Sequence, residues 1–517
     1  MAKKVYIQPG VWVVLIALAL VGAFFGIKTM QKNGMLNKVS NAVAPSSSQS
    51  GVKVVKVGGK TPLVVALNTW CGFAPGVYFN GGLMPSEVSR FTKEFDVPVQ
   101  FVIMDNFDDS RNAWKAGKVD VICNTADVLP TEMPSMTQYQ PKTFMQLDWS
   151  RGGDVMVVRP GINSVADLAG KSVALAIGTP SQTLIITTIE SGEVKYESLQ
   201  IKKMATALDA ASAFKAGQVD AAVVWNPDDQ DCLAAIHGSK VLVSTKQAKY
   251  AIADIFYAKD EFIQSHRKEI EAFTSGWLKA ARELNQDKTL RLQAQKMMAT
   301  NFNVPEAVMN LENARFTTFG DNINFFNIQP TQGQCVKGED LYTKMARAFN
   351  KIGLAPDNVP AWRAITDISV LQAISKDFTN PGDEAEGNTS FSKPTEEMKT
   401  VAAISTKRIT INFPSGSSVV SEDARYIIDR DFSPIAKSMA GYRVRVEGNT
   451  DNTGSIATNK ALSKKRAQAV ADYLVSTYNF DRNRFIIVGN GPDSPVADNG
   501  TEEGKAKNRR TDFELIQ

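Results

Sequence analysis

Two oppositely charged side chains near the C-terminus, Asp451 and Arg466, have a spacing that could hold one small ligand. They lie in the polar stretch NTDNTGSIATNKALSKKRAQ, residues 449–468. A guanidinium binds a carboxylate through two parallel hydrogen bonds, and an aspartate accepts hydrogen bonds from an ammonium group. The pair could therefore bind both ends of a zwitterion. The alternative is a surface salt bridge between the two side chains, which would contribute at most about 1 kcal/mol.

Composition excludes several other kinds of site. The chain has 517 residues, 43% hydrophobic and 22% charged, which is typical of globular protein and enough for two or three domains. A net charge of +4 gives no electrostatic reason to expect a nucleic-acid partner. The two histidines, His237 and His266, are far apart, and the sequence has no GxSxG, Walker or HExxH motif. We therefore expect no enzyme activity, no metal and no cofactor.

The cysteines leave the redox state open. Four are spread widely through the chain, and no pair has the spacing of zinc ligands. An even number in an exported protein allows zero, one or two disulfides, and buried free thiols are the alternative. The four are Cys71, Cys123, Cys232 and Cys335.

The last part of the chain, residues 405–517, is predicted to be an α+β domain that positions the charged pair. Its pattern predicts a helix starting at Ser421 and a second helix over residues 459–478. Strands are predicted at residues 409–413, 442–447, 485–488 and 510–516. Asp451 would then leave a strand into a loop, and Arg466 would lie about two turns into the following helix.

Four blocks of this region carry a resemblance to a known family. They are EGNTDNTG (447–454), NKALSKKRA (459–467), VGNGPDSPVADNGTEEG (488–504) and NRRTDF (508–513). Together they resemble the OmpA-like peptidoglycan-binding domain. The resemblance implies that Asp451 binds the ammonium group, and Arg466 the carboxylate, of diaminopimelate in the peptide stem. It also implies that four further residues shape this pocket: Asn459, Leu462, Asn508 and Arg509.

An internal repeat predicts the architecture of residues 61–375. Residues 113–120 read AWKAGKVD and residues 213–220 read AFKAGQVD. In each copy a predicted helix ends at a glycine suited to a left-handed cap, Gly117 or Gly217, and an apolar strand follows. Alternating strands and helices indicate parallel βαβ units. We therefore expect an α/β fold of two similar lobes, with a ligand at the carboxyl ends of the strands.

The predicted strand ends favour a small polar ligand. A helix starting after Gly178 would present free N–H groups and hydroxyls, which suits an anionic group, although a simple helix cap is the alternative. Acidic residues at 105, 108, 109, 127 and 154 make a zwitterion or a neutral molecule equally suitable. Residues 148–154, DWSRGGD, are predicted to cross from the first lobe to the second, and residues 252–258 to cross back.

Ordered blocks in this region resemble periplasmic solute-binding proteins of the nitrate, sulfonate, taurine and thiamine-precursor group. They include LNTWCGFAPGVYF, DLAGKSVALAIGTPSQTLI and AASAFKAGQVDAAVVWNP. The resemblance implies a two-lobed fold that closes over a small polar or anionic solute and delivers it to an ABC-type permease. The two tryptophans could instead be core aromatics. The implied contact residues are Trp70, Thr125, Asp127, Thr179, Ser181, Gln182, Trp225 and Asn226.

The N-terminus carries a candidate membrane helix. Residues 11–27 are uncharged and apolar, and as a helix they would span about 25 Å of a core near 30 Å. We predict an uncleaved transmembrane anchor over residues 1–30, with a cleaved signal peptide as the alternative. Residues 31–60 and 376–404 are rich in linker residues.

Together these segments predict a single-pass inner-membrane protein with its bulk in the periplasm of a Gram-negative-type bacterium. It would bind peptidoglycan and a small solute, for import or sensing. One alternative is a cell-envelope scaffold whose middle domain has no ligand. Another is a relative of motor stators, which the uncharged membrane span argues against.

Overall fold

Three β-sheets organise the part of the chain that the structure describes. The computed structural model describes residues 52–328, 336–411, 413–414 and 416–517. The predicted membrane helix at residues 11–27 and Cys335 lie outside these residues. Among the described residues, none of the helices combines the length and apolar character needed to cross a membrane.

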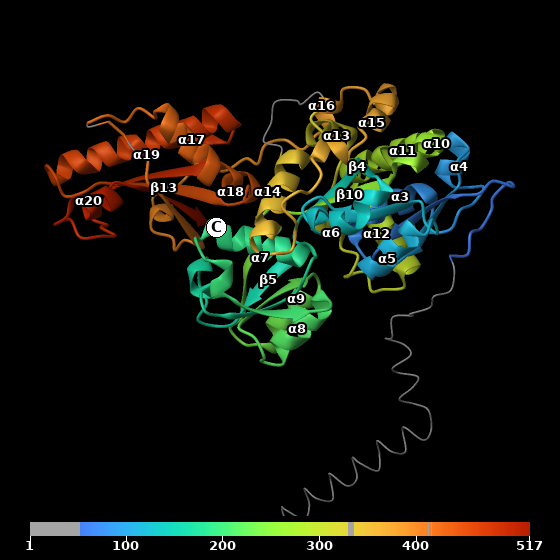
Figure 1. The fold of residues 1–517 in the computed structure, drawn as a ribbon, viewed down its shortest axis with the longest axis horizontal. Coiled ribbons are helices and arrows are strands. Elements are labelled where there is room, and N and C mark those ends of the chain that lie inside the picture. The colour runs from blue at the N-terminus through green and yellow to red at the C-terminus, as the bar shows by residue number, and fades with distance from the viewer. Residues whose placement is uncertain (1–51, 329–335, 412, 415) are drawn as a thin grey trace, which may run out of the picture. The chain divides into compact units, whose positions relative to one another are not determined.

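The first sheet has six strands in the order β11-β4-β10-β3-β1-β2. β1 pairs in parallel with β2 and β3, whereas β10 is antiparallel to β3 and β4. In Figure 1 this sheet is accompanied by α3 (Ala74–Asn80), α11 (Arg267–Gln286) and α12 (Lys288–Phe302). The strands are β1 (Leu63–Leu67), β2 (Val99–Ile103), β3 (Val121–Thr125), β4 (Pro141–Ser150), β10 (Ala253–Lys259) and β11 (Ala314–Phe316).

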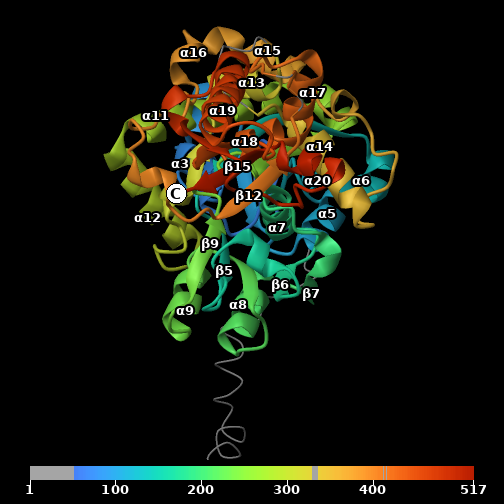
Figure 2. The same ribbon diagram turned by 90° about the vertical axis from the view of Figure 1, so that its left-hand side faces the viewer.

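The second sheet has five strands in the order β7-β6-β8-β5-β9. Figure 2 shows its strands together with α8 (Ala207–Lys215) and α9 (Asp228–Ala235). The predicted α/β alternation is confirmed in both sheets, which form the two lobes of the middle domain. The strands are β5 (Asp154–Val158), β6 (Ser172–Ala176), β7 (Gln200–Met204), β8 (Ala221–Trp225) and β9 (Lys240–Ser244).

Two crossover segments connect the lobes. The first, residues 151–153, joins β4 to β5 inside the predicted segment. The prediction for the return crossover is wrong: it runs over residues 245–252, because the apolar run that follows forms most of β10, a strand within the first sheet. Thr245 joins the two crossovers, since its hydroxyl accepts a hydrogen bond from Gly152 N at 2.8 Å and lies 2.8 Å from Ser150 Oγ.

The sequence repeat forms the same helix end, a glycine cap followed by an aspartate, in both lobes. Gly117 and Gly217 follow α5 (Phe107–Lys115) and α8 with φ of 69° and 81°, as the predicted left-handed caps. Asp120 Oδ2 then accepts from Val64 N in β1 at 2.8 Å. In the second lobe Asp220 Oδ2 accepts from Ser172 N in β6 at 2.8 Å. In each copy, the aspartate after the helix thus binds the backbone of the neighbouring interior strand of its own sheet.

We predict that Gly117→Ala and Gly217→Ala each lower the free energy of unfolding by about 1 kcal/mol, because an alanine at positive φ is strained. A methyl group at either position meets no heavy atom closer than 3.6 Å, so the expected loss of stability comes from backbone strain and not from a steric clash. Chemical denaturation of the full chain measures it. Gly387→Ala is the matched control, since Gly387 has open space and an ordinary φ. Losses equal to that of the control would contradict this interpretation.

The third sheet belongs to the C-terminal domain and has the order β12-β15-β13-β14. The predicted strand at 409–413 is wrong by four residues: β12 covers Ser405–Ile409, a mostly polar edge strand whose pairing with β15 sets its position. The predicted helix cap is confirmed, because Ser421 Oγ accepts from Ala424 N at 3.2 Å. The other elements are α17 (Glu422–Asp431), α18 (Ser433–Ser438), β13 (Arg443–Asn449), α19 (Ile456–Tyr478), β14 (Phe485–Gly491), α20 (Glu502–Asn508) and β15 (Thr511–Ile516).

Residues 376–404, which join the middle domain to the third sheet, make specific contacts along their length. Glu386 forms an ion pair with Arg151 at 2.6 Å and accepts from the Tyr250 hydroxyl at 3.1 Å. Phe391 N donates to Asp481 Oδ2 in the C-terminal domain at 2.8 Å. The segment is therefore held by contacts from both sides.

Candidate functional site

A small cavity of about 40 Å³ lies where the strand ends of the two lobes meet beside the crossovers. That volume has room for about three water-sized groups. Three of the residues predicted to contact a solute line it. The lining residues are Asn68, Thr69, Trp70, Phe107, Thr125, Ser150, Asp154, Pro180, Trp225, Ile252 and Asp254.

Strand ends deliver these side chains to one place. Trp70 follows β1, Thr125 ends β3 and Trp225 ends β8, so all three come from the carboxyl ends of strands. Asp254 comes from the start of β10, which runs antiparallel to β3 and therefore begins at the same edge. The site is located where α/β sheets usually bind ligands.

Trp70 connects the first lobe to the crossover. Its indole Nε1 donates to Asp148 Oδ2 at 3.2 Å. A side chain at Gly153 would meet the Trp70 ring at 2.2 Å, so the ring lies directly over this crossover glycine. Gly72 must lack a side chain for a similar reason, because its Cβ would lie 1.8 Å from Asp148 Oδ2.

Two buried aspartates face each other next to the cavity. Asp148 in β4 and Asp254 in β10 are directly opposite in the strand register, and they are 0% and 8% exposed. Burial raises the pKa of the Asp254 carboxyl well above its usual range, and the neighbouring Asp148 charge raises it further. Two carboxylates this close in a dry environment cannot both be ionised cheaply. The pair therefore retains a proton unless a positive charge joins it.

Two more buried aspartates complete the group. Asp154, 5% exposed, accepts from Ser150 Oγ at 2.8 Å, and burial raises its pKa to about 7. Asp127, fully buried, accepts from Ala253 N at 3.3 Å, and burial raises its pKa to about 6. In the described part of the chain, no cluster of His, Cys, Asp or Glu has the geometry of a metal site.

The other predicted solute contacts lie around the cavity without lining it. The Thr179 hydroxyl donates to Ala176 O at 3.0 Å, and Gln182 Oε1 accepts from Gly178 N at 2.8 Å. Asn226 bonds to Asp229 and to Asn313. Ser181, at the start of α7 (Pro180–Ser191), is fully buried, and its hydroxyl has no hydrogen bond within the described residues.

Sequence reasoning missed part of the site. Asp254 and Ile252 belong to a stretch assigned to the return crossover, and Asp148 was seen only as part of the first crossover. The sequence did contain a signal for Asp254, because this aspartate lies inside the apolar run AIADIFYA. Burying a charge among apolar strand residues costs free energy, so its presence indicates a functional role. The thiols of Cys71 and Cys123 are also buried nearby, and with Cys232 they are free.

We predict that Asp154→Asn stabilises the unliganded protein more as pH rises. The native pKa of Asp154 near 7 exceeds the usual 3.8, so the folded state binds the extra proton and loses stability between about pH 4 and 7. The gap between variant and wild type should grow by up to about 4 kcal/mol across this window. Denaturation curves at pH 4 and pH 8 measure it. A gap that does not change with pH would contradict the buried, protonated state.

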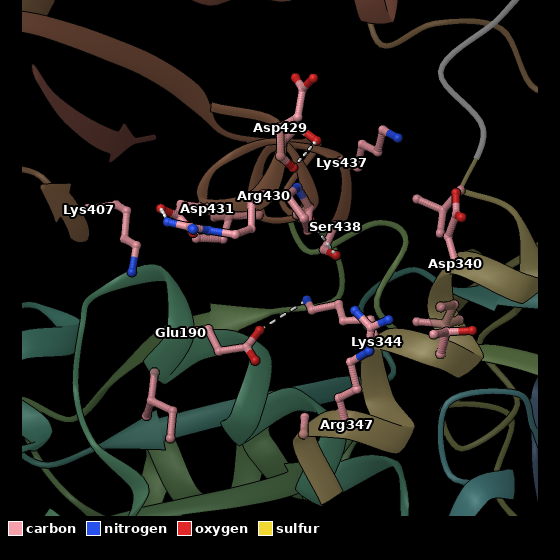
Figure 3. Close-up of a pocket in the computed structure, with 18 of the residues that line it drawn as sticks. Glu190, Asp340, Lys344, Arg347, Lys407, Asp429, Arg430, Asp431, Lys437 and Ser438 are labelled. Carbon is pink, nitrogen blue, oxygen red and sulfur yellow. Dashed lines mark hydrogen bonds and ion pairs between the residues drawn. The ribbon is translucent and has the colours of Figure 1, made fainter. Parts of the chain in front are cut away.

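A much larger hollow, about 1040 Å³, lies elsewhere, between α7, α14 (Gly338–Lys351) and the α17–α18 region. Figure 3 shows its charged lining. Lys344 pairs with Glu190 at 3.2 Å, and Arg430 pairs with Asp431 at 2.6 Å. These four charged side chains already have partners, so they are less available to a ligand than the carboxyl groups beside the smaller cavity.

The predicted wall-binding residues gather at one end of the third sheet. Asp451 Oδ2 forms an ion pair with Arg509 Nη1 at 2.6 Å, and its Oδ1 accepts from Thr453 N at 2.9 Å. Burial opposes ionisation, but Arg509 and Thr453 outweigh it and lower the pKa of Asp451. Arg466 donates to the backbone carbonyl oxygens of Ser417 and Pro414, and it interacts electrostatically with both Asp451 and Arg509.

Close packing of α19 fixes the position of Arg466. A side chain at Gly448 of β13 would lie 2.1 Å from Ser463 O, and one at Gly489 of β14 would lie 2.6 Å from Lys460 O. Only glycine lets the helix approach the sheet this closely. Arg466 is one turn beyond Ser463, so its backbone is set by this contact.

The other predicted pocket residues hold loops. Asn459 Nδ2 donates to Thr453 O at 2.9 Å, which anchors the loop that carries Asp451. Asn508 Oδ1 accepts from Val496 N at 2.7 Å and Ala497 N at 3.0 Å, which anchors the loop before α20. Leu462 is half-buried on α19.

Two family models match parts of this chain. Residues 153–287 match the NMT1/THI5 like family, and residues 412–509 match the OmpA family. The chain therefore joins a region similar to the NMT1/THI5 like family to a region similar to the OmpA family.

Curated relatives match the C-terminal domain. Outer membrane porin F of Pseudomonas aeruginosa is 37% identical over 115 residues, 22% of this chain and 33% of that protein. Peptidoglycan-binding protein ArfA of Mycobacterium bovis is 41% identical over 98 residues, 19% of this chain and 29% of that protein. The chain thus spans about a third or less of the length of these relatives.

Solved structures resemble the middle domain at low identity. The periplasmic aliphatic sulphonate binding protein SsuA from Escherichia coli has a TM-score of 0.45 and 17% identity, covering 59% of this chain and 92% of that one. The periplasmic nitrate-binding protein NrtA from Synechocystis PCC 6803 has a TM-score of 0.48 and 9% identity, covering 63% and 91%. The two-lobed fold rests on the sheet topology described above.

Proposed function

We propose that this protein is a peptidoglycan-associated, solute-binding protein of the bacterial cell envelope. The observation that carries the proposal is the cavity, lined by tryptophans and carboxyl groups, between two lobes joined by two crossovers. Such an arrangement closes around a ligand by bending at the crossovers, with Gly152 at φ 121° as one point of bending. The match of residues 153–287 to the NMT1/THI5 like family supports a solute ligand.

The C-terminal domain would hold this receptor at the cell wall. Diaminopimelate has an ammonium group and a carboxylate, and Asp451 and Arg466 offer the complementary charges. The 41% identity to a relative named as a peptidoglycan-binding protein supports this role. In the proposal, residues 11–27 anchor the chain in the inner membrane, and the receptor supplies an ABC-type permease or senses its solute.

We predict that Asp451→Ala and Arg466→Ala each abolish pelleting of the full chain with purified peptidoglycan, because each removes one of the two complementary charges. The measurement is the fraction of protein in the pellet after centrifugation. Asp472→Ala is the matched control, since Asp472 lies on the same helix α19 and pairs with the exposed Arg482. If both site variants pellet like the control, the wall-binding role is wrong.

A second experiment tests the solute-binding role. Native mass spectrometry of the gently purified full chain should detect a small bound molecule, and Trp225→Ala should lose it, because Trp225 lines the cavity. Its control is Trp362→Ala, which truncates a tryptophan packed among aromatic residues away from the cavity. No retained molecule, together with no thermal shift across a broad panel of solutes, would contradict solute binding.

A further inference from the structure

The charged side chains that line the cavity are all acidic. Asp154 and Asp254 line it directly, and Asp148 and Asp127 lie close behind them. In the described chain, no lysine, arginine or histidine is among the lining residues. Arg151 interacts electrostatically with Asp148, and Arg291 with Cys71, but both are bound elsewhere: Arg151 to Glu386 at 2.6 Å, and Arg291 to Glu312 at 3.1 Å. An anion would therefore enter this cavity with no positive side chain to meet it.

The walls and the unused polar atoms suit a positive charge. Trp70 and Trp225 line the cavity, and the face of an indole ring attracts cations. Asp154 Oδ1 and Thr125 Oγ1 form no hydrogen bond within the described residues, although these side chains are 5% and 3% exposed. Buried polar atoms without partners are costly. Asp154 therefore awaits a donor from a ligand, whereas the Thr125 hydroxyl can accept or donate, and the Trp225 indole N–H, also without a partner in the described chain, can only donate.

The helix start that would favour an anion already has internal partners. Gly178 N, just before α7, donates to the side chain of Gln182, and the Thr179 hydroxyl donates to Ala176 O. Near its start, α7 leaves the hydroxyls of Ser181 and Thr183 without a hydrogen bond in the described chain, and both are neutral groups that can accept as well as donate. The attraction of the helix for negative charge is therefore small beside the four carboxyl groups.

We propose that the cleft binds a small organic cation through its head group, a primary ammonium or an amidinium. The head group would lie between the two tryptophans, and its N–H groups would donate to Asp154 and Asp254. This inference rests on the proposed solute-binding function and specifies the class of ligand. Binding would release protons, because a cation favours the ionised form of carboxyls that burial keeps protonated. Affinity should therefore rise from pH 5 to pH 8.

Several groups contribute to that pH dependence. The titrating carboxyls come from β4, β5, β10 and the segment after β3, and the two buried thiols interact with them. The Arg151 guanidinium interacts with Asp148, and the Arg291 guanidinium interacts with the Cys71 thiol. The thiols stay protonated, because burial raises their pKa. The groups are Asp127, Asp148, Asp154, Asp254, Cys71, Cys123, Arg151 and Arg291.

A thermal-shift panel on the full chain at pH 7.5 tests the proposal. The cationic probes are butylamine, putrescine and agmatine, and the anionic probes of similar size are butyrate, ethanesulfonate and nitrate. We expect at least one cation to raise the melting temperature and no anion to do so. A shift with anions alone would overturn the cation proposal and leave solute binding intact. No shift with either set would overturn the proposal too, and with no co-purified molecule it would also count against solute binding.

Calorimetry with the best cationic probe supplies the variant test. Asp154→Asn and Asp254→Asn should each weaken binding at least tenfold, whereas the exposed Asp472→Asn should not change it. Titrations in buffers of different ionisation enthalpy should show proton release for the wild type and less release for Asp154→Asn. Unchanged affinity in both cleft variants, or no proton release, would contradict the proposal.

Discussion

The cost of burying carboxyl groups without a counter-charge is the constraint on which the cleft depends. Asp148 and Asp254 are adjacent on neighbouring strands, and Asp154 and Asp127 are buried beside them. Such a group destabilises the empty fold once ionised, so it needs a functional reason. The crossovers bring the carboxyls of both lobes to one cavity, and a bound positive charge would offset the cost only when the lobes are together.

The C-terminal domain also holds a buried carboxyl group, but it supplies the counter-charge from within the protein. Asp451 and Asp254 are equally buried, at 8% exposed, but Arg509 pairs with Asp451 at 2.6 Å in the unliganded protein. A ligand ammonium would therefore exchange with a partner that is already present, and the site costs little stability when empty. Under the proposed function, this difference would suit a domain that stays at the cell wall beside a receptor that must bind and release.

Much of the fold could be predicted from the sequence, because its signals are local. The apolar runs of β1 and β8 and the repeated glycine caps predicted the two lobes, and Ser421 predicted the start of α17. The edge strand β12 was misplaced, because pairing with β15 sets its position rather than its polar sequence. Trp70, Thr125 and Trp225 were predicted near the ligand, but Asp254 was not, since only the antiparallel register of β10 brings it to the strand ends. Likewise, Thr179 and Gln182 form hydrogen bonds with the backbone of their own loop. No sequence motif indicates that these side chains are occupied in this way.

The most direct measurement is the titration of aspartate carboxyls by ¹³C NMR on the full chain, with and without the best cationic probe. The buried-carboxyl cleft predicts a resonance that titrates near pH 7 in the unliganded protein, disappears in Asp154→Asn, and moves to lower pH when the cation binds. Titration of every aspartate below about pH 5 in the unliganded protein would contradict the central claim.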